Sequence, residues 1–286
     1  MTPDVADAVE KVTGFRVIAS SEKAVSGGCI HRSAIFETEN GPSLFIKQNS
    51  AEARELFSTE FQSLEWIAST NTIRVPNPVG YGEAGGSAFL AMEAITLSSH
   101  GDSNRMGRHL SRLHSVTGDS FGADFDNFIG ATPQPNTRTE SWAEFFVDHR
   151  LGHMFHLAAK RGKTFARRNE LLERVRDHLN SLDITPSLLH GDLWGGNAGF
   201  DEHGEPVLFD PACYLGDREA DIAFTKVFGG FGPGFYRAYR EEFSEPEPVR
   251  ETIYNLYHIL NHYVLFGGGY ANQAEGMMEE ILRALS

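Results

Sequence analysis

The sequence predicts an α+β protein in which a small, mostly antiparallel sheet with one helix precedes a larger, mainly helical region. Short apolar runs separated by turn residues dominate the chain up to about residue 96, and helical periodicity dominates the rest. The 286 residues are enough for two such regions. We therefore divide the chain into two predicted lobes, residues 1–96 and 97–286.

Six runs in the first lobe have the length and composition of strands. The predicted strands are 15–19, 22–25, 33–37, 43–47, 79–81 and 88–92. The dipeptide Asn40-Gly41 favours a tight hairpin turn between two of them. Between the fourth and fifth strands, residues 51–68 carry an apolar stripe at helical spacing, which predicts one amphipathic helix. A short helix is expected at 3–12.

The second lobe consists mainly of helical patterns. Helices are predicted at 105–114, 142–159, 169–182, 220–228 and 252–266, with a closing helix around 277–285. Residues 121–136 contain several glycines and prolines and are expected to form a long irregular loop. Loops of that length often have a functional role.

Composition excludes several classes of protein. The formal net charge is −14, which opposes a general nucleic-acid or anionic-membrane partner. No run approaches the roughly 20 apolar residues that a membrane span requires. The acidic, polar start is unlike a signal peptide. The two cysteines, Cys29 and Cys213, are too few for a disulfide framework, so a cytoplasmic location is expected.

The stretch from Leu188 to Asp210 contains the groups on which the functional prediction depends. Asp192 is a carboxylate in a loop bracketed by glycine, and Asn197 follows five residues later. A short predicted hairpin then returns the chain so that Asp210 lies beside Asn197. One carboxylate that can accept a proton and two oxygen ligands for Mg²⁺ are the set that phosphoryl transfer requires.

These residues resemble a known catalytic loop. His190-Gly191-Asp192, then Asn197, a hairpin and Asp210 are similar to the H-R-D loop and the D-F-G aspartate of the protein-kinase-like fold. The longer strings H-G-D-L-W-G-G-N and D-P-A-x-Y-x-G-D-R-E-x-D-I-A resemble the fructosamine/ketosamine kinase family. The resemblance covers nearly the whole chain. It implies a two-lobed protein-kinase-like fold related to the aminoglycoside phosphotransferases.

The resemblance also implies an ATP site in the first lobe. Gly27 and Gly28 lie in the turn expected to cover the phosphates, and Lys47 ends the strand whose lysine contacts them. The pattern F-x-x-E-x-x-x-L selects Glu60 as the partner of that lysine, with Glu55 as the alternative. The end of the last strand resembles the hinge that binds adenine, which implicates Met92, Glu93 and Ile95.

Site roles follow from the same resemblance. Asp192 is the expected base, Asn197 and Asp210 the expected Mg²⁺ ligands, and His190 a structural residue of the loop. The expected substrate is a ketosamine, free or protein-bound, that is phosphorylated at its 3-hydroxyl. The candidate substrate residues are Trp194, Gln134 and Asn136, with packing as the alternative for Trp194.

Two other functions are kept open. One is a phosphotransferase for aminoglycosides, choline or another small alcohol, and the other is an inactive ATP-binding regulator. No A-P-E motif follows Asp210, which opposes a protein kinase. The chain is expected to be a monomer or a homodimer. Cys29 adjoins the glycine turn, so it is either a strand residue or a redox-sensitive thiol.

Overall fold

The computed structural model describes residues 1–25, 31–98 and 100–286, and the chain forms two compact units. The first unit comprises Met1–Asp102 and Gly196–Pro211, and the second comprises Ser103–Gly195 and Ala212–Ser286. The first unit therefore extends past the predicted boundary at residue 96. It also includes the segment with Asn197 and Asp210, which the sequence analysis assigned to the second lobe.

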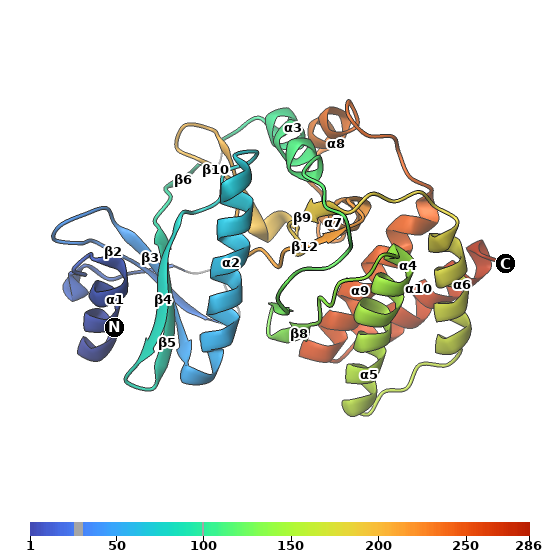
Figure 1. Cartoon of the computed structure of the whole chain (residues 1–286), viewed down its shortest axis with the longest axis horizontal. Helices are drawn as coiled ribbons and strands as arrows, with labels where there is room; N and C mark the ends of the chain where they lie inside the picture. Colours follow the sequence, from blue (N-terminus) through green and yellow to red (C-terminus); the bar gives the residue numbers. More distant parts are fainter. Residues whose placement is uncertain (26–30, 99) are drawn as a thin grey trace. The chain divides into compact units, whose positions relative to one another are not determined.

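The first unit is organised around a five-stranded sheet in which every neighbouring pair is antiparallel (Figure 1). The strand order is β1-β2-β3-β5-β4, so β1 and β4 form the edges. Pro78 begins edge strand β4, where its missing N–H removes no bond of the sheet interior. The strands are β1 (Lys23–Val25), β2 (Arg32–Phe36), β3 (Leu44–Ser50), β4 (Pro78–Ala84) and β5 (Ser87–Glu93).

The strand predicted at 15–19 is wrong. Val17 makes only an isolated bridge to Thr38, and a 3₁₀ turn, η1 (Ala19–Ser21), follows. Both the backbone N–H and the hydroxyl of Ser21 donate to the Ile18 carbonyl, at 2.9 and 2.7 Å. Such local bonds of serine compete with strand pairing.

Two helices cover opposite faces of this sheet (Figure 1). Helix α1 (Pro3–Thr13) packs Val5 and Val9 on the face that contains Leu44 and Ile46 of β3. Helix α2 (Arg54–Thr70) follows the turn η2 (Ala51–Ala53) and lies on the other face. Because strand side chains alternate between faces, Lys47 lies on the α2 face.

A second, three-stranded sheet completes the first unit. Strand β10 (Ala198–Asp201) pairs with β11 (Pro206–Leu208) on one side and β6 (Leu97–Ser98) on the other. The hairpin predicted after Asn197 is therefore present. Its pairing with β6, together with a bond from Leu208 N–H to the Arg74 carbonyl, attaches it to the first unit. Neither contact is local in sequence, which is why the sequence alone assigned this segment to the other lobe.

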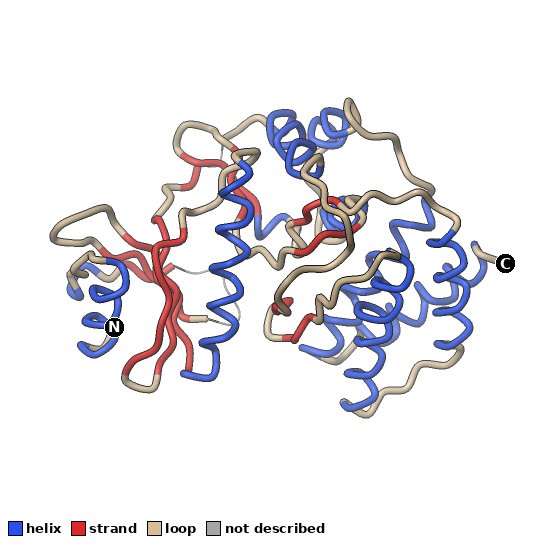
Figure 2. Tube along the Cα trace, viewed as in Figure 1, coloured by secondary structure: helices blue, strands red, loops and turns tan. Residues whose placement is uncertain are grey.

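The second unit is mainly helical (Figure 2). Helix α9 is its centre, with a buried run from Ile253 to Asn261. A π-helix, η3, separates α4 from α5, which distinguishes this region from the single helix predicted at 142–159. The helices are α3 (Ser103–His114), α4 (Trp142–Glu144), η3 (Phe145–Gly152), α5 (His153–Lys160), α6 (Arg168–Asn180), α7 (Glu219–Thr225), α8 (Pro233–Tyr239), α9 (Pro248–Phe266) and α10 (Tyr270–Ala284).

Two short strand pairs complete this unit. Strand β9 (Ser187–Leu189), directly before the His190 loop, pairs with β12 (Tyr214–Gly216). The segment predicted to be irregular contains a hairpin of β7 (Asn127–Ile129) and β8 (Thr132–Gln134). No helix among the described residues is long and apolar enough to span a membrane.

Tight packing of α3 on α8 gives a first prediction. A Cβ at Gly107 would lie 2.3 Å from the Phe235 carbonyl oxygen, whereas a Cβ at Gly276 of α10 meets no atom within 4 Å. Gly107→Ala should lower the free energy of unfolding by about 1–3 kcal/mol because the backbone must move. Gly276→Ala, the matched control, should raise it by about 0.5–1 kcal/mol. Urea unfolding of both variants tests this, and equal effects would contradict the packing.

Candidate active site

The candidate site of the first unit is centred on the Lys47 ammonium group. Its Nζ lies 2.6 Å from Glu60 Oε1 and 2.6 Å from Asp210 Oδ1. Lys47 and Glu60 are buried, whereas the Asp210 side chain is half exposed. The alternative partner, Glu55, lies exposed in the first turn of α2. One lysine thus joins the sheet, helix α2 and the hairpin that ends at Asp210.

Burial and the neighbouring charges have opposite effects on the pKa of Lys47. Burial alone would lower the pKa of Lys47, but the Asp210 and Glu60 carboxylates outweigh it and raise that pKa, so the ammonium stays charged. Burial raises the pKa of Glu60 to about 7, and the Asp210 charge adds to the rise while Lys47 opposes it. The buried lysine is therefore a permanent positive charge adjacent to the exposed edge of Asp210.

Asn197 and Asp210 lie at the two ends of one hairpin. Ala198 pairs with Leu208, and the N–H of Phe209 donates to the Asn197 carbonyl oxygen at 2.9 Å. Asp210 has a φ of 53°, which is a left-handed conformation that few residues other than glycine adopt. Unfavourable backbone conformations of this kind concentrate at functional sites. Asn197 is mostly buried, and its role and that of Asp210 as metal ligands stay predictions.

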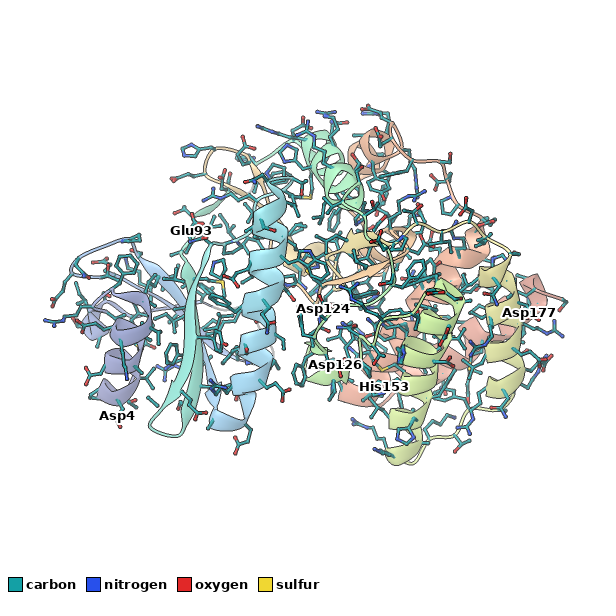
Figure 3. The ribbon with its side chains drawn as sticks, in the orientation of Figure 1. Asp4, Glu93, Asp124, Asp126, His153 and Asp177 are labelled. Atoms are coloured by element: carbon teal, nitrogen blue, oxygen red, sulfur yellow. The ribbon has the colours of Figure 1, made fainter. Side chains whose placement is uncertain are left out.

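An arginine clamp, which the sequence analysis did not identify, fixes this hairpin to the main sheet. The Arg74 guanidinium pairs with Asp201 on β10 and, at 2.5 Å, with the carboxylate of Glu93 at the end of β5. Figure 3 labels Glu93 at this position. Asp201 is buried and also accepts the N–H groups of His203 and Glu205 at 2.9 Å. No local pattern reveals Arg74, because its partners are distant in sequence.

The predicted adenine contacts lie at the end of β5. Met92 is buried, and the N–H of Glu93 donates to the Asn77 carbonyl at 2.9 Å. Ile95 follows the strand, and the role of all three residues stays a prediction. Gly27, Gly28 and Cys29 lie outside the described residues.

In the second unit, a buried carboxylate holds the loop that carries Asp192. Asp221 Oδ2 accepts the N–H of His190 at 2.7 Å, and Oδ1 accepts that of Gly191 at 2.9 Å. His114 Nε2 lies 3.1 Å from Oδ2. Burial alone would raise the pKa of Asp221, but the hydrogen bond from His114 and the bonds to the loop lower it. Asp221 therefore stays a carboxylate and fixes the loop backbone.

His190 and Gly191 each have a structural role in this loop. His190 is fully buried, and its Nδ1 accepts the N–H of Asp192 at 3.2 Å. Its carbonyl accepts the N–H of Ala212 at 2.8 Å. Gly191 has a φ of 84°, and a Cβ there would lie 2.1 Å from the Ala212 carbonyl oxygen. The close approach of these two segments therefore requires glycine at position 191.

Gln134 and Asn136, which the sequence suggested as substrate residues, are buried in a hydrogen-bonded network. Gln134 Nε2 donates to Asn127 Oδ1 at 2.7 Å, and Gln134 Oε1 accepts the Tyr257 hydroxyl at 2.5 Å. Asn136 Nδ2 also donates to Asn127 Oδ1, at 2.9 Å. Asn127 in turn donates to the Cys213 carbonyl at 3.0 Å. This burial opposes direct substrate contact and favours a supporting role for both side chains.

The π-helix supplies the cation of this network. Arg150 is fully buried, donates to the Pro135 carbonyl and to Asn136 Oδ1 at 2.6 Å, and lies over the Tyr214 ring at 4.1 Å. Asp126, labelled in Figure 3, accepts the Asn136 N–H at 2.7 Å. These contacts attach the segment after β8 to β12, which follows the Ala212 turn.

Trp194, the remaining candidate substrate residue, is half-buried and meets Phe228 edge to face, with ring centroids 5.6 Å apart. Among the described residues, no group of three or more His, Cys, Asp or Glu side chains is arranged to hold a metal ion.

Comparison with a distantly related solved structure defines the fold of this protein. A thermostable mutant of an aminoglycoside phosphotransferase, in a ternary complex with ADP and hygromycin B, superposes with a TM-score of 0.66. The alignment covers 98% of both chains at 15% identity, which shows the fold alone. The predicted protein-kinase-like α+β fold is therefore confirmed.

Closer relatives then specify the family. A structure described as a candidate fructosamine-3-kinase from Haemophilus somnus has a TM-score of 0.89 and 30% identity, over 98% of this chain and 97% of that one. A probable ketoamine kinase of Synechocystis is 42% identical, over 98% of this chain and 96% of its own. The chloroplastic protein-ribulosamine 3-kinase of Arabidopsis thaliana is 39% identical, over 92% and 82%.

The sequence model of the fructosamine kinase family matches residues 1–284, so the chain belongs to the fructosamine kinase family. This confirms the family that the sequence resembled. Membership of a kinase family implies ATP as the phosphate donor and, typically, a divalent metal ion.

Asp221 provides a test of how the loop is held. Asp221→Asn keeps the shape but replaces one acceptor oxygen with a donor that faces backbone N–H groups. The free energy of unfolding should fall by roughly 2–4 kcal/mol. Asp183→Asn, an exposed carboxylate in the same unit, should change it by less than about 0.5 kcal/mol. Similar unfolding curves for the two variants would show that Asp221 does not anchor the loop.

His258, on α9, predicts a pH dependence. Its ring stacks on Phe224 of α7 at 3.6 Å, and burial lowers its pKa from 6.5 to about 3. Because the unfolded chain takes up the proton first, this stability is present above pH 6.5 and is lost as the pH falls toward 3. His258→Phe should lose less stability on acidification, by up to about 1.4 kcal/mol per pH unit.

Urea unfolding at pH 7 and pH 5 measures the difference in the free energy of unfolding between the parent and His258→Phe. His156→Gln, at an exposed position of α5, is the control and should follow the parent. A difference between parent and His258→Phe that does not depend on pH would contradict the interpretation.

Proposed function

We propose that this chain is an ATP- and Mg²⁺-dependent kinase that phosphorylates the 3-hydroxyl of ketosamines, on free or protein-bound amines. Membership of the fructosamine kinase family supports the substrate class, and the name of the Arabidopsis relative supports a protein-bound ribulosamine and the 3-position. The observation that carries the proposal is the buried Lys47 ammonium, held by Glu60 and by the exposed Asp210.

In this proposal the first unit holds the nucleotide. Lys47, oriented by Glu60, contacts the phosphates. Because the pKa of Lys47 is raised, its ammonium group keeps its positive charge near neutral pH. Asn197 and Asp210 are on one hairpin and offer the carboxylate and amide oxygens that Mg²⁺ prefers. Bound MgATP supplies the phosphoryl group and the cations that neutralise its developing charge. The main chain at the end of β5, near Met92, Glu93 and Ile95, receives the adenine.

The second unit supplies the base. Asp192 orients the sugar hydroxyl and accepts its proton as the oxygen attacks the phosphorus. A base acts well only when its position is fixed, and Asp221 and His190 fix the backbone on the N-terminal side of Asp192. Gln134 and Asn136 act indirectly. Their hydrogen-bonded network supports the Ala212–Cys213 segment, and the Ala212 carbonyl lies against Gly191 in the loop that carries Asp192.

A substrate panel separates this proposal from the two alternatives that the sequence left open. The parent protein is incubated with ATP, Mg²⁺ and, separately, fructosyl-lysine, ribulosyl-lysine, kanamycin or choline, and ADP release is measured. Turnover is expected with the ketosamines only, and NMR should place the phosphate on the 3-hydroxyl. Turnover restricted to kanamycin or choline would favour the small-alcohol phosphotransferase. Nucleotide binding without any turnover would favour the inactive regulator.

Asp192→Asn tests the base. The amide keeps the size of the side chain but accepts no proton, so kcat should fall by at least ~10²-fold. The affinity for MgATP should stay within about two-fold, because the proposed nucleotide contacts lie elsewhere. Steady-state kinetics and nucleotide titration provide both numbers, and near-normal turnover in the variant would exclude Asp192 as the base.

Asp210→Asn tests the metal site. It removes one charged oxygen ligand, so nucleotide affinity in the presence of Mg²⁺ should fall by about ten-fold or more, with a smaller change in EDTA. Glu202→Gln, an exposed change in the turn of the same hairpin, is the control and should bind like the parent. If Asp210→Asn binds MgATP as tightly as the parent does, another residue holds the cation.

A further inference from the structure

Five rings form a continuous aromatic row in the second unit, and the row begins two residues after Asp192. We define the row as Trp194, Phe228, His262, Phe266 and Tyr270. Trp194 and Phe228 have ring centroids 5.6 Å apart, and Phe228 and His262 are 5.3 Å apart. His262 then meets Phe266 at 5.8 Å and Tyr270 at 5.1 Å.

Buried contacts hold the middle of the row in place. His262 and Phe266 are one turn apart on α9, and Nδ1 of His262 donates to the His258 carbonyl at 2.8 Å. Phe224 of α7 stacks on His258 below and meets Phe228 at 6.0 Å. The middle of the row is therefore packed against residues of α7 and α9.

The outer part of the row is exposed to solvent. Phe228 is 43% exposed and Phe266 is 56% exposed. Among the described residues, the other large apolar side chains that are exposed are Val12, Val25 and Leu97, and all three lie in the first unit. The two large apolar side chains that are exposed among the described residues of the second unit therefore both contact His262. Fixed apolar groups that gather on a surface mark a binding site.

We propose that the aromatic row binds the amine side of the substrate, that is, the substituted lysine and the polypeptide that bears it. This inference rests on the proposed function, in which Asp192 receives the sugar. In a ketosamine, the amine is attached to carbon 1 of the sugar. The substituent on that amine must therefore extend out of the sugar site along a surface that begins next to the sugar. A row of rings that starts at Trp194 provides such a path.

The chemistry of the row suits this occupant. The nitrogen of a ketosamine is a secondary amine and carries a positive charge near neutral pH, and ring faces attract cations. The lysine stem and the neighbouring side chains of a polypeptide supply apolar surface for Phe228, Phe266 and Tyr270. The net charge of −14 also favours a lysine-rich, cationic partner.

The glycines that flank the row allow its rings to converge. Gly229 and Gly230 follow Phe228 with φ of 105° and 73°, and Gly267 and Gly268 follow Phe266 with φ of 71° and 62°. Glycine adopts such positive φ values readily, whereas other residues rarely do. Tyr270, four residues after Phe266, contacts the same histidine as Phe266 does. The row thus consists of separate segments that converge on His262.

The experiment compares a ketosamine without an extended aglycone with one inside a peptide. The substrates are fructosyl-methylamine and a lysine-centred nonapeptide glycated on that lysine, and the variant is Phe228→Ser/Phe266→Ser. The KM for the peptide should rise about ten-fold, which corresponds to about 1.4 kcal/mol of binding free energy. The KM for fructosyl-methylamine and both kcat values should stay within two-fold of the parent.

Two control variants separate the row from a general loss of apolar surface. Val12→Ser removes an exposed apolar side chain from the first unit and should leave both KM values unchanged. Phe228→Tyr/Phe266→Tyr keeps both rings and should retain the KM of the parent for the peptide. Thermal unfolding of every variant checks that the fold is intact.

Two results would overturn the assignment. One is an unchanged KM for the peptide in the serine variant, and the other is an equal rise of KM for both substrates. Calorimetric binding of the glycated peptide gives a readout that does not depend on turnover. If the parent phosphorylates neither ketosamine, the proposed function fails, and weaker peptide binding by the serine variant still supports the row. Equal binding by parent and variant, or no binding by the parent, overturns it.

Discussion

The first unit depends on one buried positive charge. Lys47 has lost most of its contact with water, so the fold must supply two carboxylates to keep it ionised, one from α2 and one from the end of the β10–β11 hairpin. Three elements that are distant in sequence are thereby tied to a single atom. The Arg74 clamp ties the same hairpin to the end of β5. Any movement of the hairpin therefore disturbs the position of Asp210 relative to the lysine.

The second unit also depends on one buried charge, which in this unit is negative. Asp221 is a buried carboxylate whose charge is satisfied by backbone N–H groups and His114, and it fixes the loop on which Asp192 lies. Gly191 allows the Ala212 carbonyl to approach this loop, and the Gln134–Asn127–Tyr257 network donates hydrogen bonds to the Ala212 and Cys213 carbonyls. In the proposed function, the Asp192 carboxylate depends on this fixed loop backbone for its position as a base.

Some of these features were accessible from the sequence because they are local. The spacing of Asp192, Asn197 and Asp210 indicated a loop and a hairpin. The resemblance to the kinase family selected Lys47 and Glu60, which form an ion pair in the structure. Other features were not accessible. Gln134 and Asn136 were predicted to be substrate residues of a long irregular loop, yet both are buried, because Arg150 and Tyr257 approach them from helices that come later in the chain.

The sequence by itself determined the family and most of the helices and strands, and it singled out the candidate reactive groups, because each is encoded by residues a few positions apart. Only the tertiary structure decided which unit contains the 196–211 segment, which carboxylate holds the loop that carries Asp192, and which exposed rings meet at His262. Each of these depends on contacts between residues that are far apart along the chain. Periodicity and motifs carry no information about such contacts, since they are set by how whole helices and strands pack.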